Sequence, residues 1–324
     1  MPAPRTPPSA PDSEASLRPF DRASVRAHRE RAAGRFGEHD FLLREIGGRL
    51  AERLDDIKRD FPRVLDLGAH DGAMAALLGD KAGSELLVQT DLSPAMIRLA
   101  RVTAVPAPRH APPLHLVADE EALPFAPASF DLALSNLSLH WVNDLPGALL
   151  QLRQALKPDG LLLAALLGGE SLFELRQCLM EAELAHESGL SPRISPFAEV
   201  RDMGNLLTRA GFALPVADCD TITVTYANAL ALMRDLRGMG ESNAIAERRK
   251  SLSRRTTLLE AAALYDRKFA GPDGRISATF QVIYLSGWAP HPSQPKPLKP
   301  GSAAHRLADA LGSDEKPAGD KATP

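Results

Sequence analysis

Short apolar runs alternate with helix-like segments through the middle of the chain. The runs have the length of strands and lie at residues 64–67, 85–90, 114–117, 130–135 and 161–167. Most of them are followed by segments in which apolar residues recur with helical spacing. Apolar strands that alternate with helices are typical of a parallel sheet covered on both faces. The pattern therefore predicts an α/β fold built on a parallel sheet.

Two more strand patterns follow late in the chain, at residues 221–226 and 278–285. The first alternates Thr with Ile, Val and Tyr, which favours a strand. The residues between the two patterns are mostly helical in character. We therefore expect a doubly wound sheet of seven strands with a helical lid inserted at about residues 228–275.

The region before the first strand has a helical pattern. Leu43, Ile46, Leu50, Leu54 and Ile57 recur at steps of three and four residues and form one helix face. This pattern predicts an N-terminal helical cap. Its first part is locally basic, with arginines at positions 18, 22, 26, 29, 31 and 35.

The organisation predicted from these patterns has a central domain at residues 61–288, preceded by the helical cap at residues 19–60. Both ends of the chain are rich in proline and poor in bulky apolar residues. Such segments cannot bury enough surface to offset the entropy of ordering. Residues 1–18 and 289–324 are therefore expected to be disordered tails.

Composition narrows the class of protein. Of the 324 residues, 44% are apolar and 24% charged, and the formal net charge is −3, which is typical of globular proteins and gives no reason to expect nucleic acid binding. Two cysteines are too few for a disulfide scaffold or a four-thiolate zinc site. No apolar run is long enough for a transmembrane segment. No secretory signal is recognised, and Asp12, Glu14 and Asp21 argue against a mitochondrial transit peptide. A cytoplasmic protein is expected.

Charge is unevenly distributed along the chain. Residues 245–270 contain seven Lys/Arg and three Asp/Glu, a net charge of +4. This run is compatible with a solvated helix face. It is also compatible with a docking surface for an acidic partner, and the sequence leaves both readings open.

The first candidate site is the glycine-containing turn at residues 66–72, between a strand and a helix. Gly68 and Gly72 allow a sharp bend and a close approach to a ligand, and a helix N-terminus can hold an anionic group. A dinucleotide-binding turn has the pattern G-x-G-x-x-G, but His70 takes the place of its central glycine. Asp66, two residues before Gly68, favours S-adenosylmethionine, whose amino group would lie near an acid.

Polar side chains follow the next three strands. Asp91 ends the second strand, where a carboxylate can accept hydrogen bonds from both ribose hydroxyls. Asp119 and Glu120 follow the third strand, where a carboxylate can accept a hydrogen bond from an adenine amino group. Ser135 and Asn136 follow the fourth strand. Open α/β sheets bind ligands at the carboxyl ends of their strands, so all of these positions fit one cofactor site.

In this order the motifs resemble those of class I S-adenosylmethionine-dependent methyltransferases. The matching positions are Asp66-x-Gly68, Asp91-x-Ser93-x-x-Met96, Asp119, Phe130-Asp131 and Leu156-Lys157-Pro158-Asp159-Gly160. The resemblance implies a Rossmann-like seven-stranded methyltransferase sheet and S-adenosylmethionine as the cofactor. The cofactor-binding residues that it implies are Asp66, Gly68, Ala69, Gly72, Asp91, Leu92, Met96, Asp119, Glu120, Ser135 and Asn136.

Further segments narrow the resemblance to one branch of this superfamily. Residues 135–146 are similar to the branch that contains malonyl-acyl-carrier-protein O-methyltransferase and the methyltransferase-like assembly factor of respiratory complex I. Residues 41–45, 168–172, 201–204 and 283–288 look more like the assembly factor. Mitochondrial members of that group are associated with hydroxylating an arginine of a complex I subunit.

The resemblance implies a methyltransferase that acts on a protein or carrier-bound substrate. The partner implied is a protein substrate, such as a subunit of respiratory complex I, or an acyl carrier protein. A non-catalytic assembly chaperone that keeps the fold is a third hypothesis. His140 is the candidate catalytic residue, as a base or positioning group at the substrate mouth. The scattered histidines do not suggest a metal site. The His70 side chain would crowd the methionine part of the cofactor, point away from it, or donate a hydrogen bond to its carboxylate.

Overall fold

The computed structural model describes residues 18–103, 112–187, 189–295 and 307–313. The chain divides into two compact units, Met1–Pro290 and His291–Pro324. The second unit contains the short helix α10 (Leu307–Leu311). Most of the two predicted tails lies outside the described residues, so their disorder stays a prediction.

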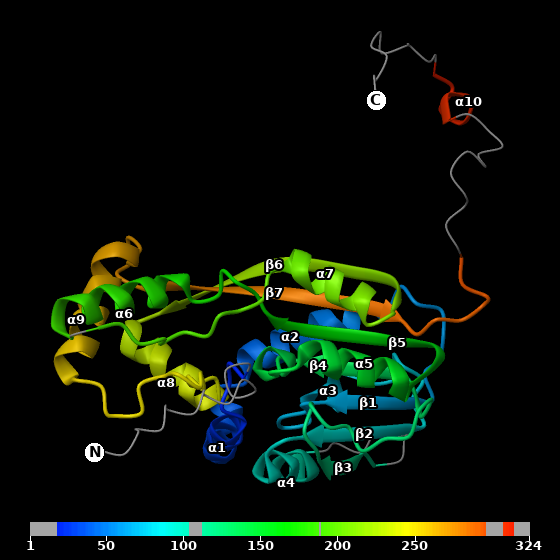
Figure 1. Cartoon of the computed structure of the whole chain (residues 1–324), viewed down its shortest axis with the longest axis horizontal. Helices are drawn as coiled ribbons and strands as arrows, with labels where there is room; N and C mark the ends of the chain where they lie inside the picture. Colours follow the sequence, from blue (N-terminus) through cyan, green and yellow to red (C-terminus); the bar gives the residue numbers. More distant parts are fainter. Residues whose placement is uncertain (1–17, 104–111, 188, 296–306, 314–324) are drawn as a thin grey trace, which may run out of the picture. The chain divides into compact units, whose positions relative to one another are not determined.

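A seven-stranded mixed sheet organises the first unit, and it confirms the predicted fold class (Figure 1). The strand order is β3-β2-β1-β4-β5-β7-β6, and only β7 runs antiparallel to its neighbours. The strands are β1 (Arg63–Leu67), β2 (Leu86–Asp91), β3 (Leu114–Val117), β4 (Phe130–Asn136), β5 (Leu156–Leu167), β6 (Ala213–Tyr226) and β7 (Ile276–Trp288). The chain reverses its direction of strand addition between β1 and β4, where such sheets bind ligands.

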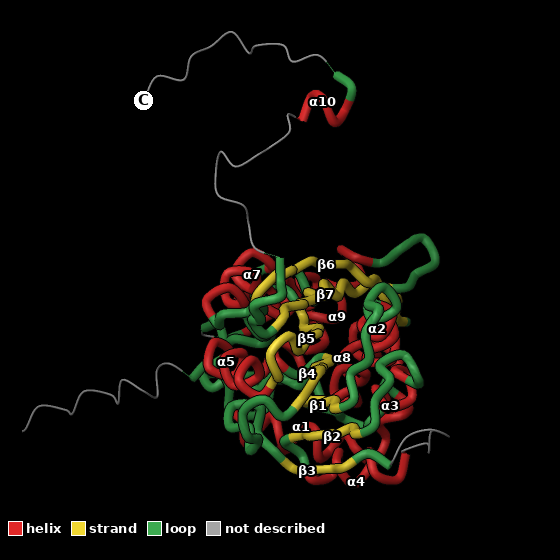
Figure 2. Tube along the Cα trace, turned by 90° about the vertical axis from the view of Figure 1, so that its right-hand side faces the viewer, coloured by secondary structure: helices red, strands yellow, loops and turns green. Residues whose placement is uncertain are grey.

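Helices cover both faces of this sheet (Figure 2). On one face lie α5 (Leu145–Ala155) and α7 (Val200–Arg209), and on the other lie α2 (Phe41–Glu52) and α3 (Ala73–Leu78). The remaining helical elements are α1 (Arg22–Ala32), η2 (Ala33–Glu38), α4 (Pro94–Thr103), η3 (Leu139–Trp141), α6 (Phe173–His186), α8 (Ala229–Met239) and α9 (Arg255–Phe269). The strands β1, β4 and β5 are buried on both sides, which explains their nearly continuous apolar sequences.

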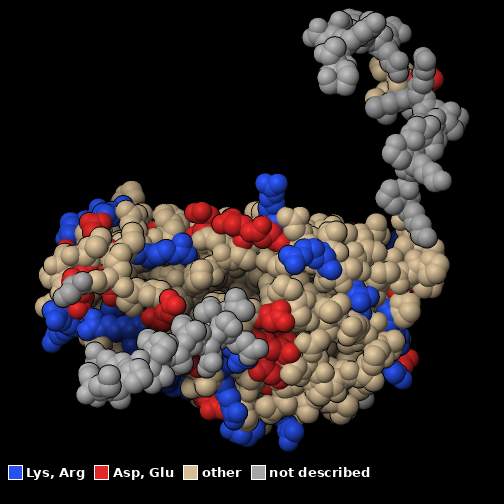
Figure 3. Space-filling model, viewed as in Figure 1, with Lys and Arg blue, Asp and Glu red and all other residues tan. Residues whose placement is uncertain are grey.

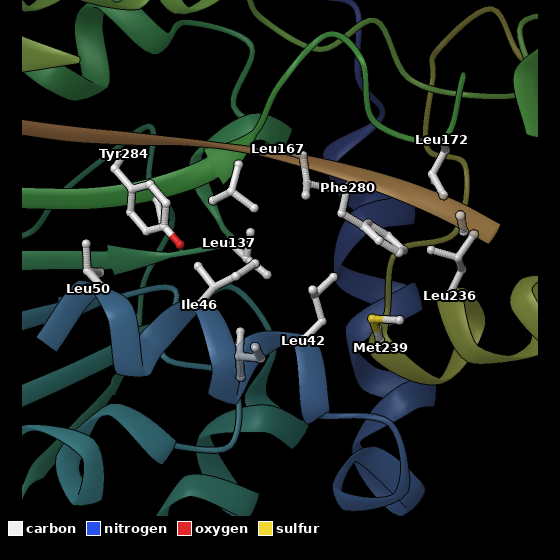
Figure 4. Packing of buried hydrophobic residues seen from close by; sticks show 14 of the residues in the cluster. Leu42, Ile46, Leu50, Leu137, Leu167, Leu172, Leu236, Met239, Phe280 and Tyr284 are labelled. Carbon is white, nitrogen blue, oxygen red and sulfur yellow. The ribbon is translucent and has the colours of Figure 1, made fainter. Parts of the chain in front are cut away.

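The larger hydrophobic core joins the cap, the sheet and the lid. From α2, Leu42, Ile46 and Leu50 point toward Tyr284 and Phe280 of β7 (Figure 4). Each fully buried aliphatic side chain contributes roughly 1.5–3 kcal/mol to stability. The helical cap is therefore part of the same core as the sheet.

The beginning of the described chain is tied to the loop that follows α8. The Asp21 N–H donates to the Ala244 carbonyl over 2.8 Å, and the Ala246 N–H donates to the Pro19 carbonyl over 2.8 Å. The Asp21 side chain caps α1 by accepting from the Ser24 N–H. These contacts hold α1 beyond the carboxyl ends of the parallel strands, next to α8 (Figure 1).

The helix α7 begins later than the local sequence around Ser195 indicates. Ser195 and Pro196 have the pattern of an N-cap and first helical residue, but α7 begins at Val200. Ser195 and Phe197 instead lie in a segment outside helices and strands, and both line a cavity. Among the described residues, no helix is both long enough and apolar enough to span a membrane.

Candidate functional site

The glycine turn after β1 has the backbone geometry that its sequence predicted. Gly68 has φ +70° and Gly72 has φ +79°, values that favour glycine over other residues. A Cβ atom at Gly68 would come within 2.2 Å of the Ser138 Cβ. The Ala69 N–H donates to the Thr90 carbonyl over 2.8 Å, which fixes the turn against β2.

Asp66 lies at the floor of this turn and is fully buried. Its Oδ2 accepts a hydrogen bond from Gln89 Nε2 over 2.9 Å, whereas Oδ1 has no partner among the described residues. Burial raises the pKa of this carboxyl to about 7, against the opposing effect of the Gln89 hydrogen bond. The Asp66 carboxylate is therefore poised to receive a cationic or hydrogen-bond-donating group.

Asp91 ends β2 and is also buried, but it has several partners. Its carboxylate accepts hydrogen bonds from the Ser93 N–H over 2.7 Å and from the His70 N–H over 3.2 Å. Arg29 of α1 pairs with the same group, with its Nη1 3.2 Å from Asp91 Oδ2. A carboxylate has about four acceptor positions. One position therefore remains for a ligand hydroxyl while Arg29 is in place.

Glu120, rather than Asp119, is the buried acid after β3. Arg29 Nη1 lies 3.0 Å from the Glu120 carboxylate, and Arg22 also pairs with it. Burial raises the pKa of Glu120, but Arg29 and Arg22 outweigh burial and lower this pKa to about 2. Arg22 also pairs with Asp119, over 2.6 Å, on the more exposed side.

The remaining predicted cofactor residues are two polar residues, Ser135 and Asn136, and two apolar residues, Leu92 and Met96. Ser135 Oγ and Asn136 Oδ1, at the end of β4, are buried and have no partner among the described residues. Met96, by contrast, is fully buried in the hydrophobic core. Leu92 packs beside the cluster of apolar side chains around Trp141. The structure therefore brings the polar residues together at one edge of the sheet, whereas the Met96 side chain belongs to the hydrophobic core.

Unpaired buried polar atoms at this edge fit a polar ligand such as S-adenosylmethionine. The atoms are Asp66 Oδ1, Ser135 Oγ, Asn136 Oδ1 and both ring nitrogens of His70. Each unsatisfied buried polar group costs about 1–3 kcal/mol. A ligand with a charged amino group, a carboxylate and hydroxyls would remove several of these costs at once.

A mostly apolar cavity of about 190 Å³ adjoins the glycine turn, and we call it the site cavity. Its apolar walls come from the cap, the sheet and the lid (Figure 4). The side chains labelled there that line it are Leu42, Leu137, Leu167, Leu172, Leu236, Met239 and Phe280. Its polar lining includes His39, His70, Arg193, Arg237 and Glu241. A cavity with few polar groups next to a cofactor edge is suited to hold a substrate group.

Among the described residues that line the site cavity, Glu241 is the only acid. Its side chain is 13% exposed. Its Oε2 accepts from Trp141 Nε1–H over 3.0 Å and lies 3.0 Å from His140 Nε2. Its Oε1 makes no hydrogen bond to any described residue. Burial raises the pKa of Glu241, but His140 and other neighbours outweigh burial and lower it. The carboxylate is therefore held charged, with one oxygen free.

His140, the predicted catalytic residue, supports Glu241 rather than lining the site cavity. It lines a smaller hollow with Leu139, Leu166 and Phe197. Its Nδ1 is buried without a partner among the described residues. In this arrangement His140 contacts the Glu241 carboxylate, and a catalytic role for His140 stays a prediction.

His70 takes an unusual position in the glycine turn. Its φ of +51° lies in the left-handed region, which non-glycine residues rarely adopt. The ring stacks on Phe36, with centroids 5.8 Å apart, and lines the site cavity. Burial lowers the pKa of His70, which favours the neutral ring. The side chain therefore points from the turn toward the substrate space.

Sequence reasoning missed Arg22, Arg29 and Glu241 as site residues. Arg29 is 1% exposed and lies on the same face of α1 as the buried Val25 and Ala32. An arginine at helical spacing among buried apolar positions was the available signal. No pattern in the local sequence identifies Glu241 as a site residue. Its position beside His140 and Trp141 depends on how the lid packs against the rest of the chain.

The basic run at residues 245–270 is largely used within the chain. Arg248 pairs with Asp21 over 3.1 Å. Arg249 and Arg254 both pair with Glu187. Figure 3 shows basic and acidic side chains next to one another at the end that carries α6 and α9. These ion pairs join the lid to neighbouring elements, and a docking surface for an acidic partner stays a prediction.

Within the described ranges, no group of three His, Cys, Asp or Glu side chains could hold a metal ion. The expectation that the protein binds no metal stays a prediction.

The fold and the polar edge of the sheet together define a class I S-adenosylmethionine-dependent methyltransferase domain. Consistently, a family model described as a methyltransferase domain matches residues 65–164.

The similarity extends over nearly the whole chain. It is 45% identical over 299 residues to "Arginine-hydroxylase NDUFAF5, mitochondrial" of Danio rerio, covering 92% of this chain and 91% of that protein. It is 38% identical over 276 residues to the malonyl-[acyl-carrier protein] O-methyltransferase of Laribacter hongkongensis, covering 83% and 90%. The chain therefore belongs to the NDUFAF5 family.

A solved structure supports the fold independently. The YcgJ protein of Bacillus subtilis superposes with a TM-score of 0.53 at 15% identity, over 75% of this chain and 98% of that protein.

The predicted cellular location is wrong. The cytoplasmic location is contradicted, because the NDUFAF5 relatives are named as mitochondrial proteins.

Proposed function

We propose that this protein binds S-adenosylmethionine and transfers its methyl group to an arginine side chain of a partner protein. The partner would be a subunit of respiratory complex I, in keeping with a role as an assembly factor. The observation that carries the proposal is the free Oε1 of Glu241 in an otherwise largely apolar cavity beside the glycine turn. A charged carboxylate in such surroundings favours a cationic group.

The residues that would hold the cofactor are those at the carboxyl ends of the strands. Asp66 would receive the cofactor's amino group, and Asp91 its ribose hydroxyls. Glu120 and Asp119 lie where the adenine amino group is expected. Because Arg29 pairs with both Asp91 and Glu120, it would have to share these carboxylates with the cofactor or move away.

The cofactor, when bound, supplies an electrophilic methyl group on a sulfonium sulfur. Methyl transfer depends mainly on aligning that group with the acceptor atom. Glu241 would pair with the substrate guanidinium and fix its direction, while Trp141 and His140 hold Glu241 in place. The apolar walls would exclude water and strengthen this pairing.

The names of the relatives support arginine as the side chain that is bound. Those proteins are named arginine-hydroxylases, so the reaction itself must be tested directly. The purified protein should be incubated with S-adenosylmethionine and an arginine-containing peptide, and the product analysed by mass spectrometry. A peptide that gains a methyl group supports the proposal. Gain of an oxygen atom, or no modification, contradicts the proposed reaction.

Binding can be tested separately from the reaction. N-acetyl-arginine amide should bind in calorimetry, whereas the uncharged citrulline analogue should bind at least about tenfold more weakly, as expected for a lost charge-assisted pair. Glu241→Gln should abolish this difference. Glu247→Gln, which changes an exposed lid residue, is the matched control and should preserve it.

Malonyl-carrier methylation is the second candidate, and one observation favours it. Arg237 lines the site cavity, is exposed and pairs with no described acid. It could hold an anionic group at the mouth. Malonyl-pantetheine should then bind better than N-acetyl-arginine amide, and Glu241→Gln should strengthen its binding by removing a repulsive charge.

A further inference from the structure

Three polar side chains from separate elements form a chain of hydrogen bonds at the edge of the site cavity. Tyr226, at the end of β6, donates its hydroxyl proton to Asp235 Oδ2 over 2.9 Å. The other oxygen of Asp235, which lies in α8, is 2.5 Å from His39 Nδ1. His39 lies between η2 and α2 and lines the site cavity.

The order of donors and acceptors fixes the tautomer of His39. Burial and the neighbouring Asp235 raise the pKa of the Tyr226 hydroxyl, so it keeps its proton and acts as the donor. An Asp235 carboxylate can only accept, so His39 Nδ1 must carry a proton. In the neutral ring Nε2 then bears a lone pair. No described residue bonds to Nε2, and it is not among the fully buried unpaired atoms.

The backbone around this chain is shaped to accommodate the imidazole. A Cβ atom at position 238 would come within 2.1 Å of His39 Cδ2. Glycine is otherwise disfavoured inside a helix such as α8. Gly238 therefore leaves the space that the ring occupies. This packing and the Asp235 bond together restrict how His39 can turn.

We propose that His39 is the general base of the site cavity, held in the Nδ1–H tautomer by Asp235 and Tyr226. The proposal rests on the function proposed above. During methyl transfer, the bond between sulfur and the methyl carbon breaks, and a bond forms between that carbon and an acceptor nitrogen. The proton leaving that nitrogen passes to His39 Nε2. The resulting imidazolium is stabilised by the Asp235 carboxylate, as in other His–Asp pairs.

Asp235→Asn is the most informative variant. It can keep the hydrogen bonds to Tyr226 and His39, and it changes only which ring nitrogen of His39 carries the proton. When the Asn oxygen accepts from Tyr226, as Asp235 Oδ2 does, its amide N–H faces His39 Nδ1 and donates to it. In this orientation the ring proton moves to Nε2, and Nε2 no longer offers a lone pair. Nitrogen-15 NMR of the full chain reports the tautomer directly, with His39→Gln used to assign the signals. We expect the Nδ1–H form in the wild type and the Nε2–H form in Asp235→Asn.

Diethyl pyrocarbonate gives a chemical readout that does not depend on activity. It acylates an imidazole nitrogen that has a free lone pair, and peptide mass spectrometry locates the product. His39 should be modified in the wild type and at least about tenfold more slowly in Asp235→Asn, following the loss of the base. The exposed His186 serves as the control in the same sample and should react equally in both proteins.

Methyl transfer to N-acetyl-arginine amide should fall about 10²–10⁴-fold in Asp235→Asn and His39→Gln, with binding of S-adenosylmethionine unchanged. An Nε2–H tautomer in the wild type would overturn the proposal, as would equal labelling of His39 in both proteins. If the wild type transfers no methyl group, the proposed function fails. In that case the tautomer and labelling results still decide whether His39 is a cavity base.

Discussion

At the residue scale, Arg29 is the strongest departure from what the sequence alone suggested. It is almost fully buried and bridges Asp91 and Glu120, and its Nη2 donates to Ser138 Oγ over 2.9 Å. Burying charges is costly, and the cost is recovered only when every partner is in place. Arg29 therefore offsets negative charge at the acidic edge of the sheet.

Replacing Arg29 should destabilise the fold strongly. Arg29→Ala leaves two buried carboxylates without their shared cation, which should reduce the free energy of unfolding by about 3–5 kcal/mol. Urea unfolding followed by circular dichroism measures this change. Arg26→Ala removes an exposed i, i+4 pair with Glu30 on the same helix, and should cost only about 0.3–0.5 kcal/mol. Equal effects of the two variants would show that Arg29 is not held as described.

Asp66 should make stability fall as pH rises. Its pKa is about 7 in the folded chain, above its ordinary value of 3.8. Between these values the unfolded chain loses a proton that the folded chain retains, so unfolding becomes easier with rising pH. The Asp66→Asn variant lacks this titration. Its stability relative to the wild type should therefore increase between about pH 4 and 7, by on the order of 2–4 kcal/mol. A constant difference across this range in urea titrations would contradict the assignment.

At the element scale, most strands could be predicted from the sequence because they are buried on both faces. All five central apolar runs correspond to β1–β5, and the late pair corresponds to β6 and β7. The start of α7 could not be predicted, because the N-cap signal at Ser195 competes with a tertiary requirement. Ile194 and Phe197, on either side of it, line the site cavity. Local propensity gives way to such packing.

The candidate site could be predicted only where it depends on β-strand ends. The acids at the ends of β1, β2 and β3 follow from the rule for open α/β sheets. Arg29 and Glu241 reach the same region from α1 and from the loop after α8, and their placement depends on contacts between distant elements. No spacing rule within the sequence links residues 29, 120 and 241.

The contact between the lid and α1 gives a prediction at this scale. Arg248 Nη2 donates to Asp21 Oδ2 over 3.1 Å and to Ser24 Oγ over 2.6 Å. Arg248→Ala should loosen the first turn of α1 and speed the exchange of its amide hydrogens. Arg267→Ala removes an exposed pair with Glu260 and should leave α1 unchanged. Unaltered exchange in Arg248→Ala would mean that the lid does not hold α1.

At the scale of the whole molecule, the sheet supplies a cofactor edge, and the cap and lid enclose a cavity beside it. The unpaired buried atoms around Asp66 favour S-adenosylmethionine over a dinucleotide. His70 also occupies the position where a pyrophosphate-binding turn requires glycine. NAD and NADP should therefore give no thermal stabilisation, whereas S-adenosylmethionine should raise the melting temperature.

The central claim is that the carboxyl ends of β1 and β2 bind S-adenosylmethionine, and isothermal titration calorimetry of the full chain tests it most directly. The account predicts micromolar binding. It also predicts a loss of about 2–4 kcal/mol in Asp91→Asn, since a carboxylate that holds two ribose hydroxyls makes charge-assisted hydrogen bonds. Asp131→Asn, which changes an acid paired with Lys157, should bind like the wild type. Absence of binding to the folded wild type, or unchanged affinity in folded Asp91→Asn, would contradict the account.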